Sequence, residues 1–194
     1  MTRKKKVIEI ILNIVLGIMI VLCSVSLIFR LTHLKVVVSG SSMNPSIVDG
    51  SKGYMVKVNK HSKIERFDVV TAEYNSTNEY YIIKRVLGLP GEEVKLLDNE
   101  LTINDEVVEQ PFEFIKNPTN FPTTYWTLGD DEYLIVGDNR AGTIAPKVVT
   151  KDNIIAKNGF SYALYDMSNE KCVSGNYSSC PIIERKFYWF RGIK

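Results

Sequence analysis

The chain has 194 residues, of which 45% are hydrophobic and 24% are charged, with a net charge of +2 and a mean hydropathy of −0.04. This length suits one compact domain, or a small domain with a membrane anchor. The composition excludes a disordered chain and a disulfide-dense scaffold, and the nearly even charge balance disfavours a nucleic-acid binder. The apolar residues are unevenly distributed, however, so these averages conceal two different parts.

The N-terminal part predicts a membrane-spanning helix. An apolar run extends from Val7 to Phe29, and a helix of that length spans roughly 34 Å, enough to cross a hydrocarbon core of about 30 Å. The buried core helix of a soluble protein would usually be shorter. A cleavable signal peptide would need a small-residue cleavage site, for which Ser24-Val25-Ser26 is a weak candidate. We therefore predict an uncleaved signal anchor at 7–29.

The charges that flank this run predict its orientation. Four basic residues occupy positions 3–6, whereas Arg30 and Lys35 are the nearest basic residues after the run. The positive-inside rule then places residues 1–6 in the cytoplasm and residues 30–194 outside the plasma membrane, with a single pass. Residues 1–30 carry five basic and one acidic side chain. The outer domain is therefore slightly acidic, and we expect no nucleic-acid partner.

The outer domain, 30–194, is predicted to be mainly β. Short runs rich in β-branched and aromatic residues are separated by turn signals such as Pro90-Gly91 and Asp98-Asn99. The predicted strands are 36–38, 54–58, 68–74, 80–87, 94–97, 101–103 and 133–136. Residues 94–107 predict a hairpin. Residues 110–127, with three prolines, predict an irregular surface loop whose aromatic residues either pack on the protein or dip into lipid.

Several kinds of chemistry are disfavoured by the residues present. The chain has two histidines, His33 and His61, and neither lies in a setting typical of a buried catalytic base. Three cysteines and two histidines show no metal-ligand spacing, and no Gly-rich phosphate loop is present. We therefore expect no metal, no cofactor and no Ser-His-Asp triad.

The remaining candidate chemistry combines a serine with a lysine. Residues 39–46 (SGSSMNPS) follow an apolar strand and end in a turn, where a hydroxyl can be exposed, although such a segment is more often an ordinary loop. In the strand at 80–88, alternation puts Ile82, Lys84 and Val86 on one face, so Lys84 either shares an apolar face or lies on an edge strand facing solvent. Burial lowers the pKa of a lysine, which is about 10.4 in water, and a neutral amine can deprotonate a serine.

Four segments, in the right order, resemble the motifs of the bacterial type I signal peptidases: 39–46, 54–70, 80–92 and the GDNR sequence at 137–140. The resemblance implies the signal-peptidase β-fold behind one transmembrane helix. It also implies a membrane-bound serine endopeptidase that removes N-terminal signal peptides from exported preproteins, after small residues at positions −1 and −3. In this family the serine corresponding to Ser42 is the nucleophile and the lysine corresponding to Lys84 is the base. Phe67 stands where the family usually has glycine.

The resemblance also assigns supporting positions. Gly40 lies near the family's oxyanion hole, for which the Ser42 backbone N–H would be a donor. Asp138 and Arg140 belong to the GDNR motif and are expected to support the site. An extended substrate would add along a strand edge near Ser42, with shallow apolar pockets for its small side chains.

The sequence departs from the family after GDNR. Thr143 occupies the position of a serine that orients the lysine amine in the family, and its hydroxyl can do the same. Ala145 and Lys147 replace an aspartate and an arginine, so the ion pair that supports this loop in the family is absent. This departure motivates an alternative function: a specialised or non-catalytic relative that assists the assembly of surface proteins such as pilins. An anchored β-domain that only binds is a third hypothesis.

Three further expectations concern the rest of the chain. Cys172 and Cys180 lie close together in the outer domain and form either a disulfide or two free thiols, whereas Cys23 lies within the span. The aromatic tail at 187–194 forms either a last strand or a membrane-surface contact. We expect a monomer whose partners are signal-peptide-bearing preproteins and membrane lipid.

Overall fold

A computed structural model of the chain describes residues 3–75, 80–143, 145–165, 180–185 and 187–190. The chain divides into two compact units, Met1–His33 and Leu34–Lys194. The first unit contains a single described helix, α1 (Arg3–Thr32). Among the described residues, the segment Lys5–Thr32 is long and apolar enough to cross a membrane, with a mean hydropathy of 2.7 in its most apolar window. The predicted apolar span is therefore helical throughout.

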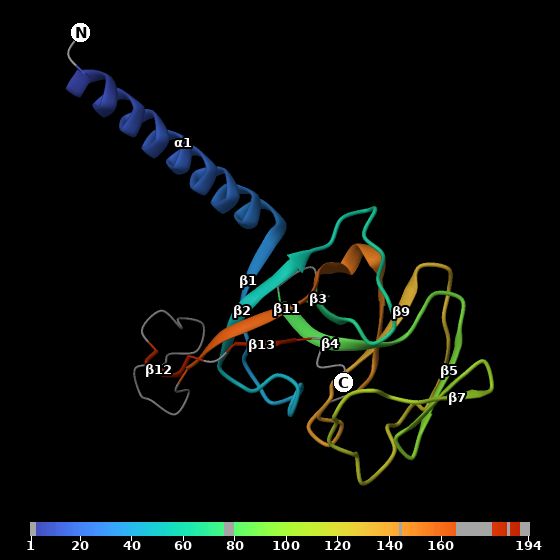
Figure 1. Cartoon of the computed structure of the whole chain (residues 1–194). Helices are drawn as coiled ribbons and strands as arrows, with labels where there is room; N and C mark the ends of the chain where they lie inside the picture. The colour runs from blue at the N-terminus through green and yellow to red at the C-terminus, as the bar shows by residue number, and fades with distance from the viewer. Residues whose placement is uncertain (1–2, 76–79, 144, 166–179, 186, 191–194) are drawn as a thin grey trace. The chain divides into compact units, whose positions relative to one another are not determined.

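The second unit is mainly β, as predicted (Figure 1). Its larger sheet contains β1 (His33–Val37), β2 (Ser51–Lys57), β3 (Val69–Asn75), β4 (Tyr80–Gly88), β9 (Glu132–Val136), β10 (Lys147–Thr150), β11 (Ile154–Tyr165), β12 (Ile182–Glu184) and β13 (Tyr188–Trp189). A 3-10 helix, η1 (Lys151–Asn153), connects β10 to β11. The strand order is β1-β2-β11-β3-β4-β9-β10, and β12 and β13 also pair with β11. The tail thus contributes a last short strand at Tyr188–Trp189, which was one of its two expected roles.

A smaller sheet lies at the opposite end of the β unit from β2 and β12 (Figure 1). It contains β5 (Glu93–Leu97), β6 (Glu100–Ile103), β7 (Glu106–Val108) and β8 (Tyr125–Thr127), in the order β7-β6-β5-β8. The predicted hairpin is confirmed, since β5 pairs antiparallel with β6. Its turn residues, Asp98 and Asn99, have φ values of 51° and 68°, which a two-residue hairpin turn requires.

The irregular segment at 110–127 contributes to the core. Phe112 and Phe121 are buried and pack with Leu96 and Leu101 of the smaller sheet. Burial of these two rings removes them from any contact with lipid. The segment runs from β7 to a short strand at Tyr125–Thr127, and both strands belong to the smaller sheet. Its buried rings also share a core cluster with Leu87 and Leu134 of the larger sheet, so the segment does not lie only on the surface.

The longest strand, β11, is absent from the predicted strands. Its 12 residues pair with both β2 and β3, so it lies in the middle of the larger sheet. Asn158 and Gly159 have positive φ, and the pairing with β2 shifts register between Lys157 and Gly159. Such a bulge interrupts the alternation of inward and outward side chains on which strand prediction depends.

The position of β4 determines the setting of its two basic residues. The strand lies between β3 and β9, with Lys84 opposite Val70 and Arg85 opposite Val69. Lys84 is therefore on an interior strand, and the edge-strand alternative is wrong. Its neighbours Val70 and Val86 are fully buried, so the lysine stem lies among aliphatic side chains.

Candidate active site

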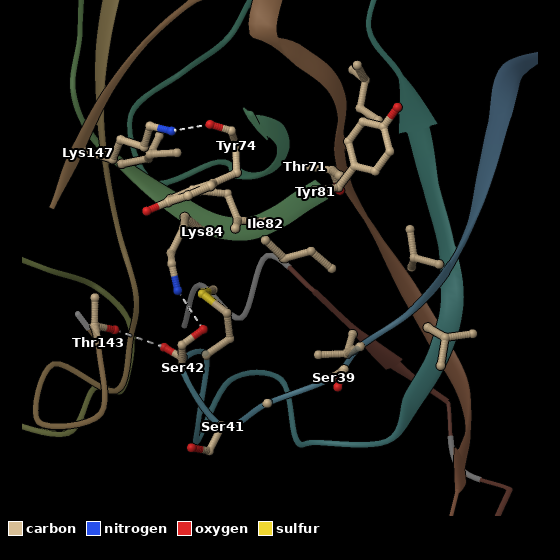
Figure 2. A pocket seen from close by; sticks show the side chains of 18 of the residues that line it. Ser39, Ser41, Ser42, Thr71, Tyr74, Tyr81, Ile82, Lys84, Thr143 and Lys147 are labelled. Atoms are coloured by element: carbon tan, nitrogen blue, oxygen red, sulfur yellow. Dashed lines mark hydrogen bonds between the residues drawn. The ribbon is translucent and has the colours of Figure 1, made fainter. Parts of the chain in front are cut away.

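A groove of about 1250 Å³ lies along the larger sheet (Figure 2). Residues of β1, β3 and β4, the segment 39–43 and the loop between β9 and β10 line it. Most of the lining side chains are apolar, among them Leu34, Val36, Met43, Ile82, Ile135 and Ile155. An apolar groove beside a strand edge suits an extended peptide with small aliphatic side chains.

Ser42 and Lys84 meet in this groove. Ser42 follows β1, at the start of the turn that leads to β2, and Lys84 extends from the middle of β4. Lys84 Nζ donates a hydrogen bond to Ser42 Oγ at 2.5 Å, and Figure 2 shows the amine directed at the hydroxyl. The two residues, 42 positions apart in sequence, are thus in direct contact.

Burial lowers the pKa of Lys84 to about 8, although the Asp138 carboxylate acts in the opposite direction. Desolvation penalises the ammonium form, because the aliphatic walls cannot replace its water shell. At pH 7 roughly one Lys84 in ten is then neutral, compared with about one in 2,500 for a lysine in water. A neutral amine carries a lone pair and can accept the hydroxyl proton of Ser42.

Asn139 fixes the backbone of the segment that carries Ser42. Its N–H donates to the Ser42 carbonyl oxygen at 3.0 Å, and its side-chain Nδ2 donates to the Ser41 carbonyl oxygen at 3.2 Å. Asn139 Oδ1 also accepts the Gly142 N–H at 2.9 Å, which closes the loop after β9. Asn139 was not among the predicted site residues, although its place inside GDNR is a usable signal.

Thr143 and Gly137 complete the wall next to the amine. Thr143 is buried, and its Oγ1 donates to the Ser42 carbonyl oxygen at 3.5 Å. A Cβ atom on Gly137 would lie 2.0 Å from Thr143 Oγ1, 2.4 Å from the Ser42 carbonyl oxygen and 3.3 Å from Lys84 Nζ. Among the hydrogen bonds of the described residues, none joins Thr143 to Lys84, so the predicted orientation of the amine by Thr143 stays a prediction.

Asp138 is held by a buried ion pair with Arg85, the neighbour of Lys84. Arg85 Nε and Nη2 donate to the two carboxylate oxygens at 2.8 and 2.6 Å, and both side chains are almost fully buried. Arg85 also donates to the Phe67 carbonyl oxygen at 2.9 Å and lies over the Phe112 ring. Phe67 has a φ of 69°, a conformation that glycine adopts without strain. The pair links β4 to the segment that follows β9.

Arg140 connects the same segment to the smaller sheet. Its Nη1 donates to the Asn99 carbonyl oxygen at 3.0 Å, its Nη2 donates to Gln110 Oε1, and its guanidinium lies over the Phe114 ring. Burial lowers the pKa of Arg140 to about 10. Its contacts with Asn99, Gln110 and Phe114 direct the Arg140 side chain toward the smaller sheet, and its expected support of the site stays a prediction.

Gly40 shapes the entry to the serine turn. Its φ of 100° is one that glycine adopts readily, and its N–H donates to Asp49 Oδ1 at 2.8 Å. Within the described part of the chain, the Ser42 N–H makes no hydrogen bond. An N–H in this state is a candidate donor to a substrate oxyanion.

Other sequence expectations fall outside this site. Cys180 is buried, but Cys172 lies outside the described residues, so a disulfide between them stays a prediction. Cys23 is a free thiol on α1. Across the described residues, no group of three or more His, Cys, Asp or Glu side chains is arranged to hold a metal ion.

Comparison with known proteins identifies the family. The family described as "Signal peptidase, peptidase S26" matches residues 7–163. Signal peptidase I of Streptococcus pneumoniae is 39% identical over 75 residues, which cover 39% of this chain and 35% of that protein. Signal peptidase I V of Bacillus subtilis is 34% identical over 118 residues, which cover 53% of this chain and 68% of that protein.

The match to the pneumococcal enzyme thus spans about a third of that relative's length. Among solved structures, a signal peptidase I from Enterococcus faecalis V583 is 23% identical, with a TM-score of 0.35, covering 48% of this chain and 94% of that one. The family match extends over residues 7–163, which is most of the sequence. The chain therefore belongs to the signal peptidase family, peptidase S26.

Proposed function

We propose that this chain is a membrane-anchored serine endopeptidase that cleaves signal peptides from exported preproteins with a Ser42–Lys84 dyad. One observation carries the proposal: the part-buried amine of Lys84, whose pKa is lowered to about 8, lies 2.5 Å from the Ser42 hydroxyl in an apolar groove. Membership in the signal peptidase family supports the reaction class.

In the first half-reaction, neutral Lys84 accepts the proton of Ser42 as Oγ bonds to the scissile carbonyl carbon. The Ser42 N–H donates to the oxyanion that forms. The carbon–nitrogen bond then breaks, and the Lys84 ammonium protonates the departing amine. The mature protein leaves with a new N-terminus, and the signal peptide remains as an ester on Ser42.

In the second half-reaction, a water molecule attacks the ester carbonyl and Lys84 accepts its proton. The ester bond breaks, the signal peptide leaves as a carboxylic acid, and the proton returns to Ser42 Oγ. Lys84 thus acts as base and acid in both halves. In this scheme Thr143 stays close to the amine and limits its rotation, whereas Gly40 shapes the turn beside the oxyanion.

The groove supports a preference for small side chains at positions −1 and −3. A bound peptide would run extended past Ser42, and alternate side chains would face the groove wall. Ile82, Met43 and Val36 are among the side chains that line the groove. Small residues fit beside such walls without displacing them.

Residues 1–6 are proposed to lie in the cytoplasm, 7–29 in the membrane and 30–194 outside, as a monomer. Ser42 lies 13 residues after Phe29, and even a fully extended chain of that length reaches at most about 45 Å. The serine therefore works near the outer membrane surface. Exposed Phe187 and Trp189 pack against Phe160, and we propose that this aromatic cluster contacts lipid headgroups.

The direct test uses the full chain in proteoliposomes with a preprotein substrate. We expect Ser42→Ala and Lys84→Met to lower the cleavage rate at least 1,000-fold, as loss of a nucleophile or its base does in serine proteases. Ser62→Ala and Lys95→Met serve as matched controls, because neither residue lines the groove, and we expect both variants to keep the wild-type rate. Wild-type cleavage by Ser42→Ala would contradict the dyad.

The scope of the enzyme is a separate question. A general enzyme restores preprotein processing in cells depleted of their own signal peptidase, whereas a dedicated enzyme processes only particular substrates. A non-catalytic assembly factor works equally well with Ser42→Ala. The dyad contact favours catalysis over this last hypothesis.

A further inference from the structure

Lys147 contacts Tyr74, and both residues line the groove. Its Nζ donates to the Tyr74 carbonyl oxygen at 2.7 Å and lies 3.8 Å from the centre of the Tyr74 ring. An ammonium over an aromatic face is attracted by the ring, so one side chain makes two interactions with one residue. Figure 2 shows this pair on the side of the groove where Ile82 and Lys84 extend from β4.

The two residues come from strands that are not neighbours. Tyr74 lies near the end of β3 and Lys147 begins β10, with β4 and β9 between them in the sheet. Contact across two intervening strands requires the sheet to curl at this point. The Lys147–Tyr74 pair therefore holds the curl in place over β4.

Lys147 also ends the loop that contacts the dyad. Thr143, four residues earlier, donates to the Ser42 carbonyl oxygen, and Asn139 at the start of the loop donates to the same oxygen. The start of the loop is fixed by Asn139. Its other end is fixed by β10 and by the contact of Lys147 with Tyr74.

We propose that Lys147 is a positioning residue that, through its contact with Tyr74, holds the loop carrying Thr143 against Ser42 and Lys84. The contact supports the loop where the sequence lacks the ion pair expected from the family. Tyr74, Thr143 and Lys147 all line the groove that contains Lys84, so loosening this wall admits water to the amine. The expected kinetic effects rest on the proposed function, whereas the positioning of the loop does not.

The effect of Lys147 on the site can be tested through the pKa of Lys84. Asp138, paired with Arg85, acts on the Lys84 amine from the segment after β9. Desolvation by burial is the larger influence and lowers the pKa of Lys84. A wall that opens removes part of this desolvation, so the pKa of Lys84 rises and the neutral base forms at higher pH.

The experiment measures kcat and KM against pH for the full chain in detergent, using a signal-peptide substrate. We expect Lys147→Met to lower kcat about 5- to 10-fold at pH 7, to change KM less than 2-fold, and to move the acidic limb of kcat/KM at least half a pH unit upward. Tyr74→Leu removes the ring but keeps the backbone carbonyl that accepts the Lys147 hydrogen bond, so we expect it to change the same quantities in the same direction by a smaller amount. Tyr74→Leu keeps the charge of Lys147, so a shift shared by both variants is not a charge effect. Lys147→Arg keeps the cation over the ring and restores most of the activity.

Lys151→Met is the matched control, because Lys151 Nζ also donates to a backbone carbonyl, that of Lys60, away from the groove. The proposal is overturned if Lys147→Met has the same kcat and the same acidic limb of kcat/KM against pH as the wild type, even if its unfolding temperature falls. Carbon-13 NMR of labelled lysines, with Lys84 assigned from Lys84→Arg, measures the pKa of Lys84 without turnover. If the pKa of Lys84 is the same in Lys147→Met as in the wild type, the proposal is also overturned. If that pKa is raised in Lys147→Met but the wild-type chain cleaves no substrate, only the proposed function is contradicted.

Discussion

Burial of Lys84 has two effects: it lowers the stability of the fold and it supplies a neutral amine. Its stem lies among fully buried aliphatic residues, Val70 and Val86, and burial lowers its pKa from 10.5 to about 8. Because the folded state disfavours the ammonium, every protonated Lys84 opposes folding. The same desolvation supplies the neutral amine that the proposed reaction needs.

Lys84→Met is therefore expected to stabilise the fold at neutral pH by about 1–3 kcal/mol, since methionine fills the same space without a charge. The folded pKa is lowered, so the penalty is complete below about pH 8. It declines as pH rises from the folded toward the unfolded value and vanishes above about 10.5. Urea unfolding of the wild type and Lys84→Met between pH 6.5 and 10.5 measures the difference in their free energy of unfolding. If this difference does not shrink as the pH rises, the lowered pKa of Lys84 is contradicted.

Gly137 is the position at which the site tolerates no side chain. A Cβ there would overlap Thr143 Oγ1 and the Ser42 carbonyl oxygen, the second of which belongs to backbone. We expect Gly137→Ala to lower cleavage at least 100-fold, because the serine turn must move away from the amine. Gly129→Ala, whose Cβ would come no closer than 3.4 Å to Glu132, should keep wild-type cleavage in the same assay.

At the scale of elements, the segment from Gly137 to Lys147 connects every part of the site. It pairs with β4 through Asp138, with the smaller sheet through Arg140 and with the serine turn through Asn139. The backbone of Asn139 and Arg140 also bonds to neighbouring segments. The described residues between β9 and β10 are thus held by specific polar contacts rather than by a strand ladder.

Asn139→Ala removes the side-chain bonds to Ser41 and Gly142 while leaving the backbone bond to Ser42. We expect kcat to fall 10- to 100-fold with a smaller change in KM, because the nucleophile loses orientation more than the groove loses shape. Asn120→Ala is the comparison, since Asn120 also makes two side-chain hydrogen bonds, but with Asp98 in the turn between β5 and β6. A variant with wild-type kcat would show that backbone bonding alone positions Ser42.

The sequence predicts the parts of this site that local patterns specify. Alternation along β4 and the serine and lysine motifs led to Ser42 and Lys84, and the turn signal Asp98-Asn99 between two short apolar runs predicted the hairpin of β5 and β6. Contacts between distant segments were not predictable in this way. The alternation of β11 is broken by its bulge, and the contact of Lys147 with Tyr74 depends on how the whole sheet curls.

At the scale of the whole molecule, the chain separates an apolar, basic N-terminal unit from a β unit of opposite net charge. The net charge of +2 hides this separation, since residues 1–30 carry five basic and one acidic side chain. Basic residues resist transfer across a membrane, so this asymmetry is an argument about topology. The proposed reaction requires the β unit to face the side on which exported preproteins emerge.

The topology is testable with single cysteines in a Cys23→Ser, Cys172→Ser, Cys180→Ser background, provided that this background still cleaves substrate. A membrane-impermeant maleimide added to intact protoplasts should label Glu106→Cys, an exposed position on β7, and should label Thr2→Cys only after permeabilisation. Replacing the basic residues at positions 3–6 with glutamine removes the charges that retain the N-terminus, and we expect Thr2→Cys then to become partly accessible. Labelling of Thr2→Cys in intact protoplasts before that change would place the N-terminus outside. The β unit would then face the cytoplasm, where a signal peptide has not yet crossed the membrane.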